Sequence, residues 1–471
     1  MASLAHPVSC LFNLSLSSKV FPTVWKTARI VPILKTGNIH HVNNYRGISI
    51  LCSLAKIFES LVHVVLYRVA RPLISEYQHG FVQQRSTTSN LMCYTNALFP
   101  EIENRKQVDA VYVDFSKAFD IVPHDYAIEK LKRMGFPEHI TGWLHSYLTN
   151  RKASVCVNSV CSKEFVLTSG VPQGSVLGPL IFVLFVNDIC TRLKSQKQMF
   201  ADDLKFYRVV SAPLDCLALQ DDINELSLWC SQNGMKMNAA KCKIVSFTRR
   251  SDSVNHTYYI DGNVLERVTS IRDLGVTIDS KLRFHDHVSI IAAKAFAVLG
   301  LIRRQSRHFT DVYTLKTLFC ALVRSILEYA VQVWAPYQLA HAVKLERIQK
   351  QFIRYALRQL PWNDPVNLPD YTARCMLLNL ETLAARRIKL QRTFIFDIIE
   401  NVIDCPELLR HINFNVPPRA LRSYPTINLP FRRTSYGRDS AYNACLKAYN
   451  DVSDLHELGM TKTAFKNRIR N

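Results

Sequence analysis

The pattern of apolar and polar positions predicts a mixed α/β arrangement in the first half of the chain. Apolar runs of strand length occupy 109–115 and 242–247, and the alternating stretch 153–170 has the pattern of a hairpin. Apolar residues at helical spacing predict helices at 51–74 and 124–136. A further apolar helix, "LIFVLFVNDI", precedes two short strands, "QMF" and "LKFYRVV". The order strand, helix, paired strands, helix and strand is that of a split β-α-β unit.

Beyond residue 280 the pattern becomes one of helices with basic faces. Examples are "HDHVSIIAAKAFAVLGLIRRQSRHF", "HAVKLERIQKQFIRYALRQL" and the final "KTAFKNRIR". The stretch 417–439 is rich in Pro and Arg, and we expect it to be a loop or a linker. These changes place soft boundaries near 280 and 400, so the expected regions are 1–280, 281–400 and a basic C-terminal region at 401–471.

Two adjacent aspartates, Asp202 and Asp203, stand in the "ADD" turn between the two short strands. Aspartate is common in turns, so a solvated hairpin tip is the better explanation of these two residues on their own. A third carboxylate, Asp114, stands at the end of the strand 109–115, where its side chain can lean into a cleft. Three carboxylates at two strand ends of one sheet can share two Mg²⁺ ions, which would activate a 3′ hydroxyl and hold a leaving pyrophosphate. Asp120, in the following turn, is expected to be structural.

A glycine-rich stretch, "SGVPQGSVLGPL", lies between these two strand ends. Gly170 and Gly174 allow the backbone to approach a ligand closely, and Gln173 supplies an amide beside them. We expect the N-terminus of the following helix to offer unpaired N–H groups to a phosphate or a base. An ordinary glycine-containing start of a helix is the alternative interpretation.

The charge of the chain points to a polyanionic partner. Lys and Arg number 59 against 38 Asp and Glu, which gives a formal charge of +21 spread along 471 residues. Such a distribution fits a groove that follows nucleic-acid phosphates better than a local basic arm. Two of the cations, Lys35 and Arg46, flank the loop between predicted strands at 28–34 and 43–51. On their own they are explained equally well as solvated loop charges.

The cysteines and the apolar runs bear on the compartment. The 13 cysteines include no CxxC motif, and the closest pair, Cys156 and Cys161, has no His or Cys partners at zinc spacing. We therefore expect free, mostly buried thiols in an intracellular compartment, the nucleus or the cytoplasm, and no structural zinc. The strongest apolar run, 179–186, is too short to span a bilayer, and the first residues lack the features of a signal peptide. No membrane partner is expected.

Nine segments of the chain follow one another as in a known family. They are "FPTVWKTARIVPILKTGN", "NYRGISIL", "KIFES", "QHGFVQQRSTTSNL", "VYVDFSKAFDIVPH", "GVPQGSVLGPLIFVLFVNDI", "FADDLKFY", "NGMKMNAAKCKIVSF" and "IRDLGVTID". On these residues the chain resembles the reverse transcriptases of non-long-terminal-repeat (LINE-like) retrotransposons, in particular the jockey-like group. The resemblance covers about residues 20–280.

The resemblance implies an α+β right-hand polymerase. Fingers and a palm with the split β-α-β sheet would occupy residues 1–280, a mostly α-helical thumb or connection 281–400, and a basic C-terminal region 401–471. It also implies the function of an RNA-directed DNA polymerase with two Mg²⁺ ions, or Mn²⁺ in their place. The partners would be an RNA template, a DNA primer or target, and deoxynucleoside triphosphates.

The same resemblance implies roles for the charged residues. Asp114 and Asp202 would be the two metal ligands, with Asp203 beside them. Lys35 and Arg46 would grip the triphosphate from the fingers.

Four further residues would form the nucleotide site. Phe119 would lie under the incoming sugar as an aromatic gate, although an aromatic residue is by default part of a core. Gln173 and Gly174 would line the site, and Lys241 would lie near the departing pyrophosphate. The "DLGV" segment would form a primer-grip hairpin.

The chain departs from the family pattern in several places. Gly47 stands where the family usually has Pro, and Cys242 stands where a hydroxyl residue is usual. We find no endonuclease segment upstream of the polymerase motifs and no Cys/His knuckle downstream. The alternative function is therefore a catalytically silent, retrotransposon-derived relic that binds RNA through its basic helices.

Overall fold

The central element of the fold is a five-stranded sheet. In the computed structural model, which describes residues 2–35, 37–250, 252–359, 369–415 and 425–469, its strand order is β12-β9-β3-β8-β7. Strand β3 pairs antiparallel with both β8 and β9, and β7 completes a hairpin with β8. The order β9-β3-β8-β7, with one helix before β7 and another before β9, is the predicted split β-α-β order. The strands are β3 (Gln107–Val113), β7 (Gln196–Phe200), β8 (Asp203–Val210), β9 (Lys243–Phe247) and β12 (Glu266–Val268).

Strand β3 separates two hydrophobic cores. Val111 and Val113 on one of its faces belong to an N-terminal core, whose buried residues run from Phe12 to Leu265. Residues on the other face, such as Val108 and Ala110, belong to a helical core that is built mainly from the chain beyond residue 275. Burial on both faces explains why this strand is an almost continuous apolar run.

The helices before residue 280 surround the N-terminal core, with the exception of α3, which packs into the helical core. Helix α6 is buried on all sides, and α4 ends where Gly135 adopts a φ of +87°. The predicted helices at 51–74 and 124–136 are confirmed as α2 and α4. The helices are α1 (Ala2–Ser17), α2 (Ser53–Ala70), α3 (Thr87–Glu103), α4 (His124–Arg133), α5 (Glu138–Leu148), α6 (Leu177–Val186), α7 (Ile189–Arg192) and α8 (Pro213–Gln232).

A second sheet has the order β2-β1-β4-β5, with β6 paired to β4. The predicted strands at 28–34 and 43–51 are confirmed as the antiparallel pair β1 and β2, and 153–170 forms the predicted hairpin. The strands are β1 (Thr27–Leu34), β2 (Tyr45–Ile50), β4 (Arg151–Val157), β5 (Val160–Cys161) and β6 (Phe165–Leu167).

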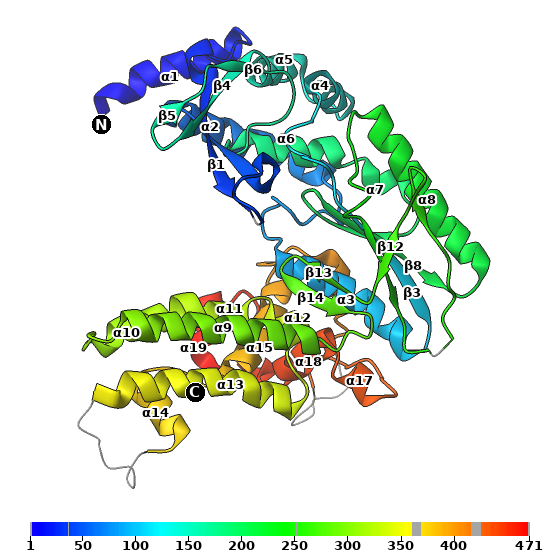
Figure 1. Ribbon diagram of the computed structural model, residues 1–471, viewed down its shortest axis with the longest axis vertical. Helices are drawn as coiled ribbons and strands as arrows, with labels where there is room; N and C mark the ends of the chain where they lie inside the picture. Colours follow the sequence, from blue (N-terminus) through cyan, green and yellow to red (C-terminus); the bar gives the residue numbers. More distant parts are fainter. Residues whose placement is uncertain (1, 36, 251, 360–368, 416–424, 470–471) are drawn as a thin grey trace.

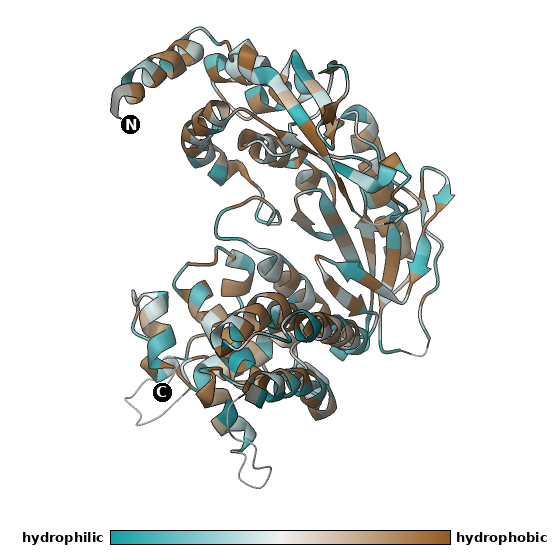
Figure 2. Cartoon of the chain, turned by 60° about the vertical axis from the view of Figure 1, so that its left-hand side comes forward, coloured by the Kyte–Doolittle hydropathy of each residue, from teal (hydrophilic) through white to brown (hydrophobic). Residues whose placement is uncertain are grey.

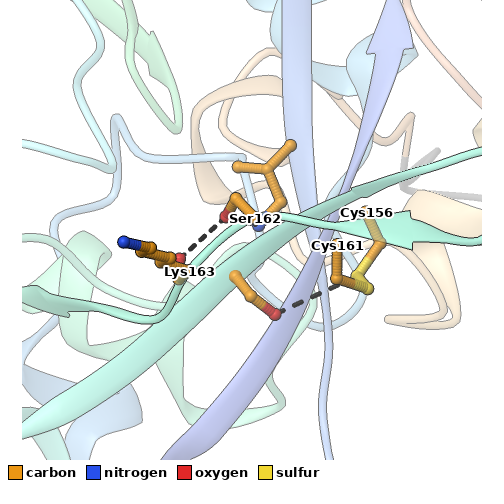
Figure 3. The surroundings of a disulfide bond; sticks show 6 residues. Cys156, Cys161, Ser162 and Lys163 are labelled. Carbon is orange, nitrogen blue, oxygen red and sulfur yellow. Dashed lines mark hydrogen bonds between the residues drawn. A yellow bond between two sulfur atoms is a disulfide. The ribbon is translucent and has the colours of Figure 1, made fainter.

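One expectation about the cysteines is wrong. Cys156 and Cys161 form a disulfide because the β4–β5 hairpin pairs them directly across the strands, with their Cα atoms 4.1 Å apart. Figure 3 shows this bond beside Ser162, whose hydroxyl donates to the Lys163 carbonyl at 2.9 Å. The other cysteines that the structure describes are free thiols, and most are buried, as predicted.

The chain beyond residue 280 is helical, as predicted. Figure 1 shows the molecule as a crescent, in which the N-terminal region and the late helices form the two arms and the central sheet joins them. Figure 2 shows that α1 projects from the N-terminal arm. The late helices are α9 (His285–Gln305), α10 (Val312–Leu318), α11 (Ser325–Glu328), α12 (Val331–Trp334), α13 (Leu339–Ala356), α14 (Tyr371–Leu377), α15 (Leu383–Ile399), α16 (Pro406–Leu409), α17 (Ser435–Arg438), α18 (Ala441–Asn450) and α19 (Lys462–Arg468).

The expected Pro/Arg-rich loop lies in part outside the described residues, and its described end contains the short helix α17.

By length and composition α9 is the one helix in the described part of the chain that could cross a bilayer. Its buried residues, including Val288, Ile291 and Leu299, pack in the helical core, and core helices often pass this test.

Candidate active site

The turn of the β7–β8 hairpin presents Asp202. Phe200 pairs with Asp203, so only Ala201 and Asp202 lie in the turn. Ala201 has a φ of +57°, and two-residue hairpin turns require such positive values. Asp202 is half-buried and Asp203 is exposed. The hairpin is therefore tight, and it fixes both aspartates at one end of the sheet.

The segment Tyr77–Gly80 holds this turn in place. The side-chain oxygen of Gln78 accepts hydrogen bonds from the backbone N–H groups of Ala201 and Gly80, both at 2.8 Å. The segment also lies along β7, since Met199 donates to the Tyr77 carbonyl at 2.9 Å. A Cβ atom on Gly80 would lie 2.2 Å from the Ala201 nitrogen, so this close approach needs glycine. Sequence reasoning missed this support, although "QHG" was among the quoted motifs.

Asp114 follows the last residue of β3 and is held by a later segment of the chain. Because Val113 pairs with Leu204, Asp114 lies at the same sheet end as Asp203. Its backbone accepts from Asn238 N–H at 2.8 Å, and its own N–H donates to Cys242 Sγ at 3.4 Å. Cys242 is buried, so the departure from the family pattern places a sulfur against the Asp114 backbone.

Opposite charges surround these three carboxylates. Burial raises the pKa of Asp202 and nearby Asp114 adds to this, while the Arg46 and Lys35 side chains oppose it. Lys241 Nζ lies 3.6 Å from the Asp114 carboxylate. The structure thus brings together Asp114, Asp202, Lys35, Arg46 and Lys241, which the sequence had predicted to meet.

The pKa of Asp203 is raised strongly. Its enclosure by protein, followed by the charges of Asp202 and Asp273, raises the pKa of Asp203 to about 6, although Lys205 opposes the shift. A bound cation offsets the repulsion between carboxylates that raise one another's pKa. A donor set made only of carboxylate oxygens suits Mg²⁺ or Mn²⁺.

A pocket of about 300 Å³ opens beside Asp114 and Asp203. The "DLGV" segment forms part of its wall as the tight hairpin of β13 (Ser270–Asp273) and β14 (Val276–Asp279), which confirms the predicted hairpin. A buried ion pair between Lys205 and Asp273 joins this hairpin to β8. The sequence analysis had not singled out several of the lining residues, which include Asn90, Lys205, Lys243, Arg272 and Asp273.

The glycine-rich stretch contacts protein backbone. Gly174 has a φ of +112°, and a Cβ atom there would lie 2.6 Å from the Ser49 carbonyl oxygen of β2. The Gln173 amide donates to the Asp120 carboxylate at 2.8 Å, which agrees with a structural role for Asp120. Gln173 and Gly174 thus bind the Asp120 turn and β2 together.

The prediction of free N–H groups at the start of α6 is wrong. The buried carboxylate of Glu59 accepts from the N–H groups of Val176 at 2.7 Å and Leu177 at 3.2 Å. An anion from the protein itself therefore occupies this helix N-terminus. Glu59 comes from α2, more than one hundred residues earlier, so the sequence gave no sign of this contact.

Phe119 lies partly in the N-terminal core. Its ring stacks on Phe182 with centroids 4.2 Å apart, and it meets the edge of Phe81 at 6.0 Å. The side chain is half-buried, so one part packs and another part stays accessible.

Lys35, directly after β1, and Arg46, near the start of β2, are both exposed beside the loop that joins these strands. The closure of this loop is fixed by a hydrogen bond from Lys35 N–H to the Asn44 carbonyl at 2.8 Å. Gly47 pairs with Pro32 inside the strands, and a Cβ atom at Gly47 would lie 2.8 Å from a methyl carbon of Ile30. Glycine at this position therefore allows β2 to pack closely on the Ile30 side chain.

Comparison with known proteins identifies the family of the chain. Residues 33–278 match the family described as reverse transcriptase (RNA-dependent DNA polymerase), and the chain belongs to this family. It is 28% identical over 370 residues to the probable RNA-directed DNA polymerase from transposon BS of Drosophila melanogaster. It is also 28% identical over 372 residues to the RNA-directed DNA polymerase from mobile element jockey of the same species. The resemblance to retrotransposon reverse transcriptases is confirmed.

These matches cover a smaller share of the relatives than of this chain. The two alignments cover 75% of this chain but 41% and 40% of the relatives, so the chain spans about two fifths of their length. Among solved structures, apo telomerase from Candida tropicalis is similar with a TM-score of 0.44 and 12% identity. That match covers 75% of this chain and 62% of the telomerase chain.

Proposed function

We propose that the chain carries out RNA-directed DNA synthesis for a non-long-terminal-repeat retrotransposon. The observation that carries this proposal is the meeting of Asp114, Asp202 and Asp203 at one sheet end, faced by Lys35 and Arg46. Phosphoryl transfer depends mainly on positioning and on charge stabilisation, and this site has charges of both signs.

The three carboxylates would hold two Mg²⁺ ions, or Mn²⁺ in their place. When bound, such ions activate the attacking hydroxyl and stabilise the charge on the leaving pyrophosphate. Asp114 and Asp202 would be the principal ligands, with Asp203 beside them. Enclosure by protein, followed by the charges of Asp202 and Asp273, raises the pKa of Asp203 to about 6, and this supports a cation site at this position.

The cations of the chain would bind the nucleotide. Lys35 and Arg46, exposed on either side of the β1–β2 loop, would contact the triphosphate. Lys241, now 3.6 Å from Asp114, would move a short way to the departing pyrophosphate. Both roles use exposed side chains near the carboxylates.

Phe119 and the glycine-rich stretch would shape the site around the sugar. The half-buried Phe119 ring is held by Phe182, so its accessible edge would reject a ribose 2′ hydroxyl by overlap. Gln173 and Gly174 would fix the adjoining turn through Asp120 and Ser49.

The right-hand architecture follows from the same assignment. Residues 1–280 would form the fingers and palm, 281–400 the helical thumb or connection, and 401–471 a basic C-terminal region. The charge of +21 supports binding of an RNA template and a DNA primer along the inner side of the crescent. The site of action would be the nucleus or the cytoplasm.

The direct test is primer extension by the purified chain on an RNA template with deoxynucleoside triphosphates. We expect extension that depends on Mg²⁺, stops with EDTA and resumes when Mg²⁺ is restored. A chain that binds the primer–template tightly but adds no nucleotide under any divalent cation would contradict the proposal. That outcome would instead support the silent RNA-binding relic.

A further inference from the structure

A cluster of metal-ligating side chains lies behind the catalytic hairpin. One ring nitrogen of His79 and the sulfurs of Cys93 and Cys405 all lie within 4.8 Å of one another. All three side chains are buried. They come from three distant segments, namely the "QHG" segment beside β7, helix α3, and the residue that precedes α16.

His79 is prepared to act as a neutral ligand. Its Nδ1 atom hydrogen-bonds with Ser89 Oγ at 2.8 Å. Because the Ser89 hydroxyl donates to the Ser86 carbonyl at 2.9 Å, it accepts from Nδ1–H, which leaves the lone pair on Nε2. Burial, followed by the charges of Arg85 and Lys205, lowers the pKa of His79 to about 3. The imidazole is therefore neutral at pH 7, which is the form that binds metals.

The two cysteines face each other. Their sulfur atoms share a hydrogen bond at 3.1 Å. This bond lowers the pKa of Cys405, while burial raises the pKa of Cys93. Zinc with Zn–S bonds of about 2.3 Å in tetrahedral geometry holds two sulfurs roughly 3.8 Å apart, so a displacement of less than about 1 Å would admit the ion.

A carboxylate beside Cys93 could supply a fourth donor. Glu407 lies two residues after Cys405, and its carboxyl group interacts with the Cys93 thiol. Glu407 is not in the group of ligand atoms within 4.8 Å of one another, so its side chain would have to turn toward them. Its Oε2 atom accepts from Gln198 Nε2 at 2.8 Å, which anchors the group next to β7. Cys, His and Glu are all ligands of zinc, whereas the all-carboxylate donors of the active site suit Mg²⁺.

We propose that His79, Cys93, Cys405 and Glu407 bind one structural zinc ion. The sequence analysis expected no structural zinc because the cysteines lack zinc-type spacing. These ligands are brought together by the fold, since Cys93 and Cys405 are 312 positions apart in the sequence. The inference rests on their positions alone and does not depend on the proposed polymerase activity.

The ion would join the C-terminal region to the core of the active site. Asp404, beside Cys405, already pairs with Arg71 and lies 3.3 Å from Arg85. His79 adjoins Gln78, which holds the Ala201 turn. A closed four-ligand site between these contacts would lock the C-terminal segment against the back of the β7–β8 hairpin.

The test measures the metal content of the full chain, expressed with added zinc, purified with a thiol reductant and dialysed. Elemental mass spectrometry should find one zinc ion per chain. Cys405→Ser and Cys93→Ser should lose it. Cys445→Ser, which changes another buried thiol outside the cluster, should keep it.

A second measurement uses the wild-type protein, so it gives a result even if the variants fail to fold. Wild-type protein loaded with Co²⁺ should show the absorption of a tetrahedral cobalt–thiolate site, and added zinc should remove it. Wild-type protein without zinc and without this spectrum would overturn the proposal. So would an unchanged zinc content in folded Cys405→Ser, or a Cys93–Cys405 disulfide as the isolated state of the wild-type chain.

Discussion

The side-chain oxygen of Gln78 accepts a hydrogen bond of 2.8 Å from the N–H of Ala201, the residue that precedes Asp202. The same oxygen accepts from Gly80, so one side chain fixes two backbone N–H groups. The position of Asp202 therefore depends on a segment more than one hundred residues earlier in the chain.

Replacing Gln78 tests this support. Gln78→Ala would leave two buried N–H groups without an acceptor, at a loss of about 1–3 kcal/mol. Misplacement of Asp202 should lower kcat for nucleotide addition by roughly 10- to 100-fold. Gln83→Ala, which removes an exposed glutamine side chain from the same segment, is the matched control for kinetics and thermal unfolding. Equal kcat values for the two variants would show that the turn keeps its conformation without the Gln78 side chain.

Gly80 gives an independent test of the same contact. A Cβ atom there would lie 2.2 Å from the Ala201 nitrogen, and neither backbone can yield without moving the hairpin. Gly80→Ala should lower the free energy of unfolding by about 1–3 kcal/mol. Gly300→Ala, in the middle of α9 with only the end of Arg304 at 3.6 Å, should instead be neutral or stabilise by up to about 1 kcal/mol. Chemical denaturation of both variants decides the matter, and a Gly80→Ala protein as stable as wild type would contradict the close packing.

We expect the sugar specificity of the proposed polymerase to depend on Phe119. Phe119→Val should reduce the ratio of kcat/KM for a deoxynucleotide over its ribonucleotide, because the ring edge no longer overlaps a 2′ hydroxyl. Since Phe119 stacks on Phe182, the melting temperature should fall as well. Phe185→Val, a buried change in the same core, should lower the melting temperature without altering the ratio. If Phe119→Val leaves the ratio at its wild-type value, the ring is only a core residue.

Stability should decrease in acid because of His287. This buried residue accepts from the Thr277 N–H at 3.2 Å, and burial together with Arg272 lowers its pKa to about 4. Between pH 6.5 and 4 the unfolded chain binds a proton that the folded chain excludes, so stability is complete above pH 6.5 and is lost as the pH falls. The loss from this residue at pH 5 should be about 2 kcal/mol.

The measurement compares the free energy of unfolding at pH 7 and pH 5. His287→Asn keeps an acceptor near Thr277 and removes the titration, so it should lose less stability between these two values than wild type. His308→Gln, at an exposed position, should behave as wild type. Identical acid sensitivity of His287→Asn and wild type would assign the loss to other groups.

The parts of the fold that sequence reasoning predicted depend on local pattern. The apolar runs of β3, β7 and β8, and the turn residues between β7 and β8, identify the sheet and put Asp114, Asp202 and Asp203 at strand ends. Lys35 and Arg46 could be placed because they flank one short loop. Short-range periodicity is enough for such features.

The missed features depend on contacts between distant segments. Glu59 reaches the start of α6, Gln78 reaches Ala201, and Cys405 reaches Cys93, each across more than one hundred residues. In each pair, the distance in sequence between the two partners follows no motif from which the contact could be recognised. The Cys156–Cys161 bond was missed for another reason, because the composition of the whole chain favoured free thiols over a local pair.

The measurement that tests the central claim most directly is single-nucleotide addition by Asp202→Asn on an RNA template. Loss of a principal metal ligand should lower the rate by roughly a thousandfold or more, while affinity for the primer–template stays close to wild type. Asp221→Asn, the same change on the exposed side of α8, should extend primers at the wild-type rate. An Asp202→Asn protein that adds nucleotides as fast as the Asp221→Asn control would contradict the assignment of this hairpin as the catalytic centre.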